Sequence, residues 1–122
     1  MSEWLALLYK LKPGTRDQVA ELFRQSGRPD HEVKDAEGNV VGTLLTTMAF
    51  VGEEAAVRVI EADGDFRAVP RHMSRQQEVK DFEAAIEPLL AEPRDMVTPE
   101  GAAAFFQRSG MRLVMVRKHD DA

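Results

Sequence analysis

Residues 70–112 read PRHMSRQQEVKDFEAAIEPLLAEPRDMVTPEGAAAFFQRSGMR, and this stretch decides the fold that the sequence predicts. Ser74 followed three residues later by Gln77 is typical of a helix N-terminus, because the two side chains can satisfy free backbone N–H groups. Pro88, near the end of this helix, is expected to kink or end it. The helix has one apolar face, since its apolar residues recur at spacings of three and four: Val79, Phe82, Ala85, Ile86 and Leu89.

A second helix is predicted to start at Thr98-Pro99, which combines a good N-cap with a proline at the first helical position. Gly110 suits the residue that follows a helix. Ala103 and the pair Phe105-Phe106 are expected to face the interior. Residues 66–73 are expected to form a short helix upstream. The whole stretch therefore predicts helices that cover another layer of the protein.

On the N-terminal side, residues 4–12 predict a strand that stops at Pro13-Gly14. Both of its faces are apolar, which is typical of a central strand covered on both sides. Thr15 with Gln18 predicts a capping box for the next helix. The inward face of that helix is predicted to hold Val19, Leu22 and Phe23.

Two hairpins are expected to follow this helix. The stretch DAEGN (35–39) supplies turn residues between two short strands. A turn at 52–54 joins longer strands at 40–51 and 55–61, which are rich in β-branched residues. Residues 111–118 are predicted to form the last strand.

The expected order is strand, helix, strand, strand, helices, strand. This is the βαββαβ order of a ferredoxin-like α+β fold, with an extra helix before the final strand. An antiparallel sheet with its helices on one face leaves the other face bare. We expect a second copy to cover that face, so that the protein is a homodimer and its two sheets form a dimeric α+β barrel. Residues 1–118 are expected to form this single domain, and residues 119–122 a flexible tail.

The composition of the 122 residues is that of a globular domain, with 43% hydrophobic and 30% charged residues. The formal net charge of −5 argues against a nucleic-acid partner and against an anionic membrane surface. The chain contains no cysteine, which excludes disulfides and thiol catalysis within it. No apolar run approaches the ~18 residues of a membrane span. We therefore expect a cytoplasmic protein.

Several short motifs are spread over nearly the whole chain. They are Lys12-Pro13-Gly14, Asp35-Ala36-Glu37-Gly38-Asn39-Val40-Val41-Gly42, Val57-Arg58-Val59-Ile60, Arg71-His72-Met73, Glu92-Pro93-Arg94-Asp95, Thr98-Pro99-Glu100-Gly101 and Phe105-Phe106. In this order and spacing the chain resembles the SchA/CurD-like family, whose members occur in aromatic polyketide and spore-pigment gene clusters of actinomycetes. The architecture of that family is related to dimeric α+β barrel proteins, which include polyketide cyclases and cofactor-independent monooxygenases.

The resemblance implies a protein of aromatic (type II) polyketide biosynthesis, with a cyclase or aromatase that uses acid–base chemistry in an apolar pocket as the favoured role. Its partner would be an aromatic polyketide intermediate. Two alternatives stay open: a cofactor-independent monooxygenase acting on a polycyclic phenol or anthrone, and a non-catalytic partner that binds intermediates beside components of the synthase. The sequence holds no dinucleotide, Walker-type or haem motif, so no cofactor is expected. Its three histidines lack metal-ligand spacing, so no metal site is expected.

His72 is the best acid–base candidate, because an unperturbed imidazole titrates near neutral pH. Arg71 beside it could hold an anion, and Tyr9 could donate a hydrogen bond to a quinone or an enolate. We predict these three as catalytic residues. The structural alternatives are that His72 packs at a helix junction, that Arg71 is solvated and that Tyr9 belongs to the core.

Five further residues are predicted to bind substrate: Trp4, Arg58, Met73, Arg94 and Asp95. Trp4 and Tyr9 lie on opposite faces of the first strand, so at most one of them faces the pocket through that strand. Arg58 could point into the pocket from its strand, where a charged group needs a partner. The alternatives are edge exposure for Arg58, core packing for Met73, and an ion pair between Arg94 and Asp95 that pins their loop.

Overall fold

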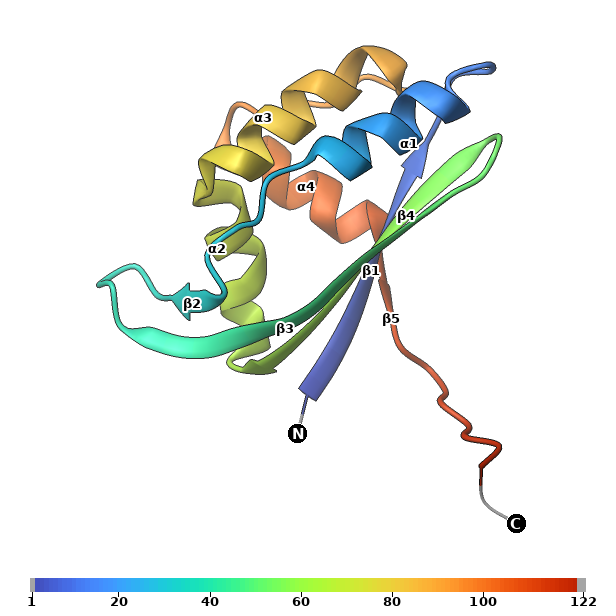
Figure 1. The fold of residues 1–122 in the computed structure, drawn as a ribbon. Helices are drawn as coiled ribbons and strands as arrows, with labels where there is room; N and C mark the ends of the chain where they lie inside the picture. Colours follow the sequence, from blue (N-terminus) through green and yellow to red (C-terminus); the bar gives the residue numbers. More distant parts are fainter. Residues whose placement is uncertain (1, 121–122) are drawn as a thin grey trace.

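The computed structural model describes residues 2–120, and its strands form one antiparallel sheet of order β2-β3-β4-β1-β5 (Figure 1). The strands are β1 (Ser2–Lys10), β2 (Glu32–Lys34), β3 (Val40–Val51), β4 (Ala55–Gly64) and β5 (Gly110–Arg112). Without the short edge strand β2, the remaining order is that of the ferredoxin-like βαββαβ fold. The predicted fold class is confirmed.

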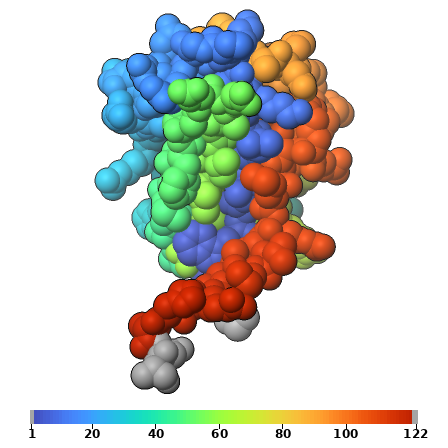
Figure 2. All heavy atoms as spheres, turned by 90° about the vertical axis from the view of Figure 1, so that its right-hand side faces the viewer, coloured from blue at the N-terminus to red at the C-terminus, as the bar shows by residue number. Residues whose placement is uncertain are grey.

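The helices all lie on one face of this sheet (Figure 1). They are α1 (Arg16–Gln25), α2 (Val69–Arg75), α3 (Gln77–Ile86) and α4 (Pro99–Ser109), with two 3₁₀ turns, η1 (Phe66–Ala68) and η2 (Glu87–Leu89). The opposite face of the sheet carries no helix among residues 2–120, and Figure 2 looks onto it.

Strand β1 is central, as predicted, because it pairs with β4 on one side and with β5 on the other. Leu7 and Tyr9 point toward the helices and are buried. Trp4, Ala6 and Leu8 alternate with them on the opposite face and are half-buried. Within the described residues, helices therefore cover only one of the two apolar faces of this strand.

The predicted turn at 35–39 joins β2 to β3. Gly38 adopts a φ of +85°, which an L side chain rarely accepts. The carboxylate of Asp35 accepts hydrogen bonds from the backbone N–H groups of Asn39 and Glu37, each at 2.9 Å. These bonds lower the pKa of Asp35, and the bond from the Asn39 N–H has the largest effect. Local hydrogen bonding thus explains why this acidic segment forms a turn.

The core between sheet and helices has two parts. The larger one surrounds the inward face of β1 and contains Leu7, Tyr9, Leu11, Val19, Ala56, Phe82, Ile86, Leu90 and Phe105. The smaller one lies at the β2 end of the sheet and contains Val33, Ile60, Ala62, Val69, Met73 and Val79. Arg58 lies between Ala56 and Ile60 on the buried face of β4, so its side chain enters this interior.

Two predicted helix caps are wrong. Thr15 makes no capping hydrogen bond to α1, because its hydroxyl donates instead to the carbonyl of Lys12 at 2.7 Å. Ser74 lies inside α2 and donates to the carbonyl of Arg71. The helix continues past Pro70 to Arg75, and the extended residue Gln76 separates it from α3. Thr98, in contrast, accepts a hydrogen bond from the Gly101 N–H, which confirms the predicted N-cap of α4.

The inward faces of the last two helices differ in detail from the prediction. Ala85 and Ala103 are exposed, while Ala102 and Phe105 are buried and Phe106 is half-buried. Ala102 and Phe105 are three residues apart and share one helix face, which excludes Ala103 from that face. Gly110 has a φ of −73° and begins β5 directly, so it is not a left-handed helix cap.

The last strand is shorter than predicted. It ends at Arg112, and residues 113–120 have no regular secondary structure. They extend away from the body of the protein (Figure 1), and Leu113, Val114, Met115 and Val116 are exposed. Nothing among residues 2–120 covers these apolar side chains, so strand pairing there would bury little surface. Of the predicted tail, residues 121 and 122 lie outside the described residues.

Candidate functional site

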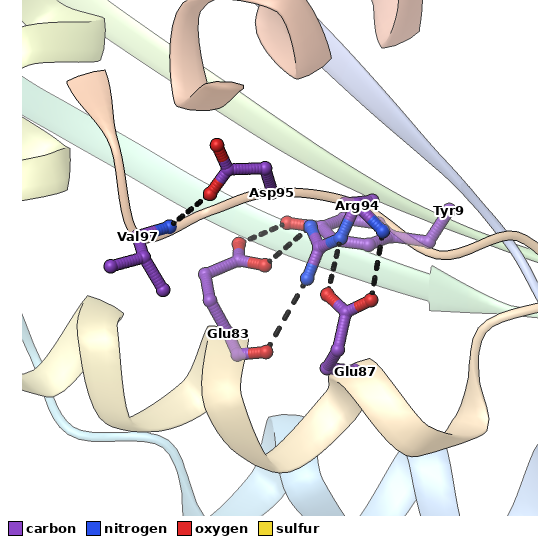
Figure 3. Close-up of polar contacts among 6 residues, drawn as sticks. All are labelled: Tyr9, Glu83, Glu87, Arg94, Asp95 and Val97. Carbon is purple, nitrogen blue, oxygen red and sulfur yellow. Dashed lines mark hydrogen bonds and ion pairs between the residues drawn. The ribbon is translucent and has the colours of Figure 1, made fainter. Parts of the chain in front are cut away.

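A network of buried polar side chains lies between the sheet and the helices (Figure 3). Tyr9 on β1 donates a hydrogen bond of 2.8 Å to Oε1 of Glu83 on α3. The other carboxylate oxygen of Glu83 accepts a 2.8 Å bond from Nη1 of Arg94. Nε of Arg94 donates to Glu87 at 2.9 Å. One guanidinium therefore forms ion pairs with two carboxylates, and the phenol adds a further donor to one of them.

This network has its origin in helix spacing. Glu83 and Glu87 are four residues apart, so their side chains lie on the same face at the end of α3. The loop that follows η2 returns beside them, and the Arg94 N–H also donates to Glu87 at 3.0 Å. The Arg94 guanidinium lies 4.4 Å from the ring centroid of Phe105, which buries its carbon stem and its flat face. Only 2% of the Arg94 side chain is exposed.

The electrostatics of the network determine the protonation state of Tyr9. Burial raises the pKa of Tyr9 far above its usual value, and the charge of Glu83 raises it further. The phenol therefore stays protonated across the physiological range. Tyr9 can donate a hydrogen bond and cannot act as a phenolate base.

Arg58 is a second buried guanidinium, and its surroundings differ from those of Arg94. The residue is 6% exposed and its Cζ lies 4.5 Å from the ring centroid of Phe82, 5.6 Å from that of Phe23 and 6.0 Å from that of Tyr9. Among residues 2–120, no carboxylate forms an ion pair with it and no acceptor forms a hydrogen bond with it.

Two cavities flank this polar interior. One of about 80 Å³ adjoins Tyr9, Arg94 and Phe105. The other, of about 50 Å³, adjoins Arg58, Phe82 and Met73. Pockets for drug-sized ligands measure roughly 300–1,000 Å³. In this conformation both cavities admit only small groups. A fused-ring ligand could therefore insert only one end, unless the sheet and the helical layer move apart.

The structure brings together four of the predicted site residues. Tyr9, Arg58 and Arg94 converge on one buried region, and Met73 lines the cavity at Arg58. Trp4 lies on the opposite face of the sheet from Tyr9, as the alternation of β1 predicts. Tyr9 is therefore the one of these two aromatic residues that faces the helix-covered interior.

His72 and Arg71 lie apart from this region. His72 is 1% exposed, and its Nε2 lies 2.7 Å from the carbonyl oxygen of Asp30. A carbonyl only accepts hydrogen bonds, so Nε2 carries the proton. Neither of the two cavities includes His72 among its lining residues. Arg71 is exposed on α2.

Asp95 is exposed and makes local hydrogen bonds rather than an ion pair with Arg94. Its carboxylate accepts from the hydroxyl and the N–H of Thr98 and from the N–H of Val97. These bonds lower the pKa of Asp95, and the bond from the Thr98 hydroxyl has the largest effect. The alternative considered for these two residues, an ion pair between them, is therefore wrong: Arg94 pins the loop through Glu83 and Glu87.

The two glutamates were missed by sequence reasoning, although a signal for one of them was present. Residues 79, 82, 83 and 86 share one helix face, so Glu83 interrupts an otherwise apolar stripe. A carboxylate in such a position needs a buried partner. Which partner it finds depends on the loop that returns beside it, and helix spacing says nothing about that loop.

Within residues 2–120, no helix is long and apolar enough to cross a membrane. The same residues hold no group of three or more His, Cys, Asp or Glu side chains arranged as metal ligands.

The helix-covered antiparallel sheet and its buried polar network define an α+β protein of the ferredoxin-like class. The chain belongs to the SchA/CurD like domain family, whose model matches residues 2–118. It is 38% identical over 109 residues to the polyketide synthase CurD of Streptomyces cyaneus. It is 35% identical to a 42.8 kDa protein in the whiE locus of Streptomyces coelicolor and 32% identical to protein SchA of Streptomyces halstedii, again over 109 residues.

These matches cover 89% of this chain but only 28%, 26% and 27% of the three relatives, so the chain spans about a quarter of their length. A solved structure described as an antibiotic biosynthesis monooxygenase from Chloroflexus aurantiacus superimposes with a TM-score of 0.56 over the whole of both chains. At 14% identity this likeness shows the fold alone.

Proposed function

We propose that this chain acts in aromatic polyketide biosynthesis, as a cyclase-type domain that binds an intermediate between sheet and helices and promotes ring closure by proton transfer. Its relatives include a protein named polyketide synthase CurD. The observation that carries the proposal is the hydrogen-bonded pair of Tyr9 and Glu83, which places a protonated phenol and a carboxylate in an apolar, aromatic interior.

Ring closure by an aldol step needs parts of this kind. A C–H proton leaves a methylene between two carbonyls, the carbanion attacks a carbonyl carbon, and that carbonyl oxygen takes up a proton before water is lost. Tyr9 lines the cavity of about 80 Å³ and is held protonated, so it can donate to the carbonyl oxygen. The single O–H of Tyr9, which is bonded to Glu83 in this conformation, must first turn to the carbonyl oxygen. Glu83 then takes the C–H proton and returns it to the phenolate of Tyr9, so that both groups are restored. Glu83 does not itself line this cavity, so the site must open before its carboxylate can reach the substrate. Phe105 contributes an apolar wall.

Access to this site requires movement, because the cavities are small. The segment between η2 and α4 contains no regular secondary structure and carries Arg94. We propose that this segment moves to admit the substrate and that the ion pairs of Arg94 with Glu83 and Glu87 close the site again. Binding energy from the aromatic rings of the intermediate would offset the cost of opening.

A cofactor-independent monooxygenase is the second candidate, and Arg58 favours it. A buried guanidinium among aromatic rings suits a planar phenolate, which is the electron-rich species that such a reaction requires. A non-catalytic role as an intermediate-binding partner of the synthase is the third, favoured by the small size of both cavities.

One experiment separates these three. The purified chain is incubated with an unreduced and a partly reduced aromatic polyketide precursor and with an anthrone, while products are identified by mass spectrometry and oxygen uptake is recorded. Cyclised products without oxygen uptake support the cyclase, and oxygen uptake with the anthrone supports the monooxygenase. Saturable binding with no product supports the binding role and contradicts both enzymes.

Variants identify the acid–base group. Tyr9→Phe and Glu83→Gln are expected to lower turnover by roughly 10²-fold or more, the usual contribution of a general acid or base. His72→Gln tests the residue that the sequence favoured: a loss of the same size would return the catalytic role to His72, and full activity would remove it. Arg71→Gln, on the exposed surface of α2, tests the predicted anion contact in the same way.

We also propose a homodimer formed through the open sheet face, which is the face opposite the helices. Its apolar side chains come from four strands: Trp4, Ala6, Leu8, Met48, Phe50, Val57, Val59 and Met111. Thr46 and Glu61 lie on the same face and are hydrogen-bonded to each other at 2.7 Å. Phe50 is 60% exposed and Met111 42%. The exposed apolar residues 113–116 follow β5 at the edge of this face (Figure 2). An apolar surface of this extent is typical of an interaction site.

A further inference from the structure

We infer that the cavity at Arg58 is a binding site for a small delocalised oxyanion, such as a carboxylate or the enolate end of a larger molecule. Arg58 is 6% exposed and, within residues 2–120, has neither an ion-pair partner nor a hydrogen-bond acceptor. It lines the cavity of about 50 Å³. The source of the anion rests on the proposed function, whereas the site itself rests on this geometry alone.

The comparison with Arg94 shows what is missing at Arg58. Both guanidiniums are buried and both lie about 4.5 Å from a phenylalanine ring centroid, at 4.4 Å for Arg94 and 4.5 Å for Arg58. Arg94 also has two carboxylates and a carbonyl oxygen. No fully enclosed side-chain nitrogen or oxygen among the described residues lacks a hydrogen-bond partner, so the nitrogens of Arg58 keep some access to the cavity. A charge that is largely removed from water and has no opposite partner is still costly, and contact with aromatic faces offsets only part of that cost. An anion in the cavity would supply the absent partner.

The walls of the cavity restrict the ligand. Its lining is largely apolar, with Phe23, Phe82, Val79 and Met73 on the helix side and Thr47 on the sheet side. A single water needs roughly 10–15 Å³ of such volume. A cavity of about 50 Å³ therefore accepts a carboxylate or a single enolate end, and excludes a complete aromatic ring system unless the ring stays outside.

The mouth of the cavity favours a singly charged ligand. It is bordered by residues that follow α1 and by Glu78 in the first turn of α3. Glu78 packs close to Gly27, where an added Cβ would lie 2.8 Å from its Cγ. The acidic side chain is exposed and makes no ion pair with Arg58. Arg58 attracts a doubly charged anion more strongly than a carboxylate, but Glu78 cancels much of this gain, and the removal of phosphate or sulfate from water costs more.

The two nitrogens at the end of an arginine match the two oxygens of a carboxylate, or the two oxygens of an enolised 1,3-dicarbonyl. Free small carboxylates and the β-dicarbonyl end of a polyketide chain share this chemistry. Ligand size distinguishes them: formate and acetate fit entirely within the cavity, whereas benzoate and acetylacetone present one end and leave the rest at the mouth.

The test measures the thermal unfolding midpoint at pH 7 and constant ionic strength, with chloride replaced by formate, acetate, benzoate, acetylacetone or sulfate. We expect a rise of about 3 °C or more at saturation for at least one of the carboxylates or for acetylacetone. Sulfate stabilises folded proteins without binding to a site, so any rise that it causes should be the same in the wild type and in Arg58→Gln. Arg58→Gln is expected to abolish the rise caused by the carboxylates or acetylacetone. Arg24→Gln is the control, because it makes the same charge change on an exposed arginine of α1.

No response of the wild-type protein to the carboxylates or acetylacetone, or an equal response to them in Arg58→Gln, would overturn the inference. If Arg58→Gln does not fold, Arg58→Lys retains the charge without the planar fork and is expected to weaken binding at least about tenfold in a calorimetric titration; unchanged affinity would also overturn it. Anion binding that needs Arg58, without turnover of any polyketide, leaves this site intact and refutes the proposed enzyme. Turnover that persists in Arg58→Gln leaves the enzyme intact and refutes this site as the one that holds its substrate.

Discussion

Tyr9 on the central strand and Glu83 on α3 form a hydrogen bond of 2.8 Å, although they are separated by 74 positions in the sequence. This bond joins the sheet to the helical layer inside the larger core. Because Glu83 also pairs with Arg94, the same carboxylate joins three segments of the chain. The polar network therefore serves the fold as well as the proposed chemistry, and variants must be judged on both.

Tyr9→Phe is expected to lower the free energy of unfolding by about 1–3 kcal/mol, because it leaves the buried carboxylate of Glu83 without one donor. Chemical denaturation at pH 7 measures this loss. Arg94 remains bound to Glu83 in the variant, so the fold should be retained. A stability equal to that of the wild type would contradict the contribution assigned to this bond.

The alkaline limit of stability is expected to depend on Tyr9. Its pKa is raised in the folded state, so the folded protein keeps the proton that the unfolded chain loses near pH 10. The contribution of this group is complete below about pH 10 and declines as the pH rises above it. Tyr9 is the single tyrosine, so the absorbance of tyrosinate reports on it alone. Titration of the folded protein with a midpoint near pH 10 would contradict the burial.

Arg94→Met and Arg58→Met are expected to differ in their effect on stability. Removal of Arg94 leaves Glu83 and Glu87 without their cation and should cost about 3–5 kcal/mol. Removal of Arg58 exposes no carboxylate and replaces an unpaired buried charge with an apolar side chain, so stability should be unchanged or raised. Denaturation of both variants, without added anion, measures the difference. Equal losses would show that Arg58 is paired.

The start of α4 is expected to depend on Thr98, whose side chain accepts from the Gly101 N–H. Thr98→Ala should lower stability by about 1 kcal/mol, the usual contribution of an N-cap. Asp95 holds the same segment and has a lowered pKa, so its contribution is present above the unfolded pKa near 4 and is lost as the pH falls below it.

Asp95→Asn should therefore reduce stability at pH 7 and make the acid limb of the pH–stability curve less steep. Asp120→Asn makes the same charge change in the segment after β5 and is the matched control. Identical acid limbs in Asp95→Asn and the wild type would refute the local role of this carboxylate.

Phe50→Glu is expected to convert the proposed dimer to a monomer, because it places a charge on the open sheet face. Sedimentation velocity at micromolar concentration measures the oligomeric state. Trp4 is the single tryptophan and lies on the same face, so its emission should shift to longer wavelength when the dimer dissociates. Val97→Glu, at a 95% exposed position before α4, is the control. A wild-type monomer would refute the dimer.

Most of the fold could be predicted from local patterns. The alternation of β1, the Asp35–Asn39 turn and the Thr98-Pro99 helix start depend on residues close in sequence, and the structure confirms them. The predicted N-caps at Thr15 and Ser74 are wrong because a hydroxyl can donate equally well to a backbone carbonyl three residues earlier. The predicted length of the last strand is wrong because nothing in the described chain covers the apolar residues that follow Arg112.

The sequence by itself determined the element order, the family and the set of charged residues from which a site can be built. Tertiary structure alone decided how these charges pair. Arg94 and Arg58 are alike in type, and local sequence does not reveal that one meets two glutamates while the other meets aromatic rings. The reason is physical: pairing in a buried layer depends on which distant segments pack together, and the strength of each charge depends on the water that this packing removes.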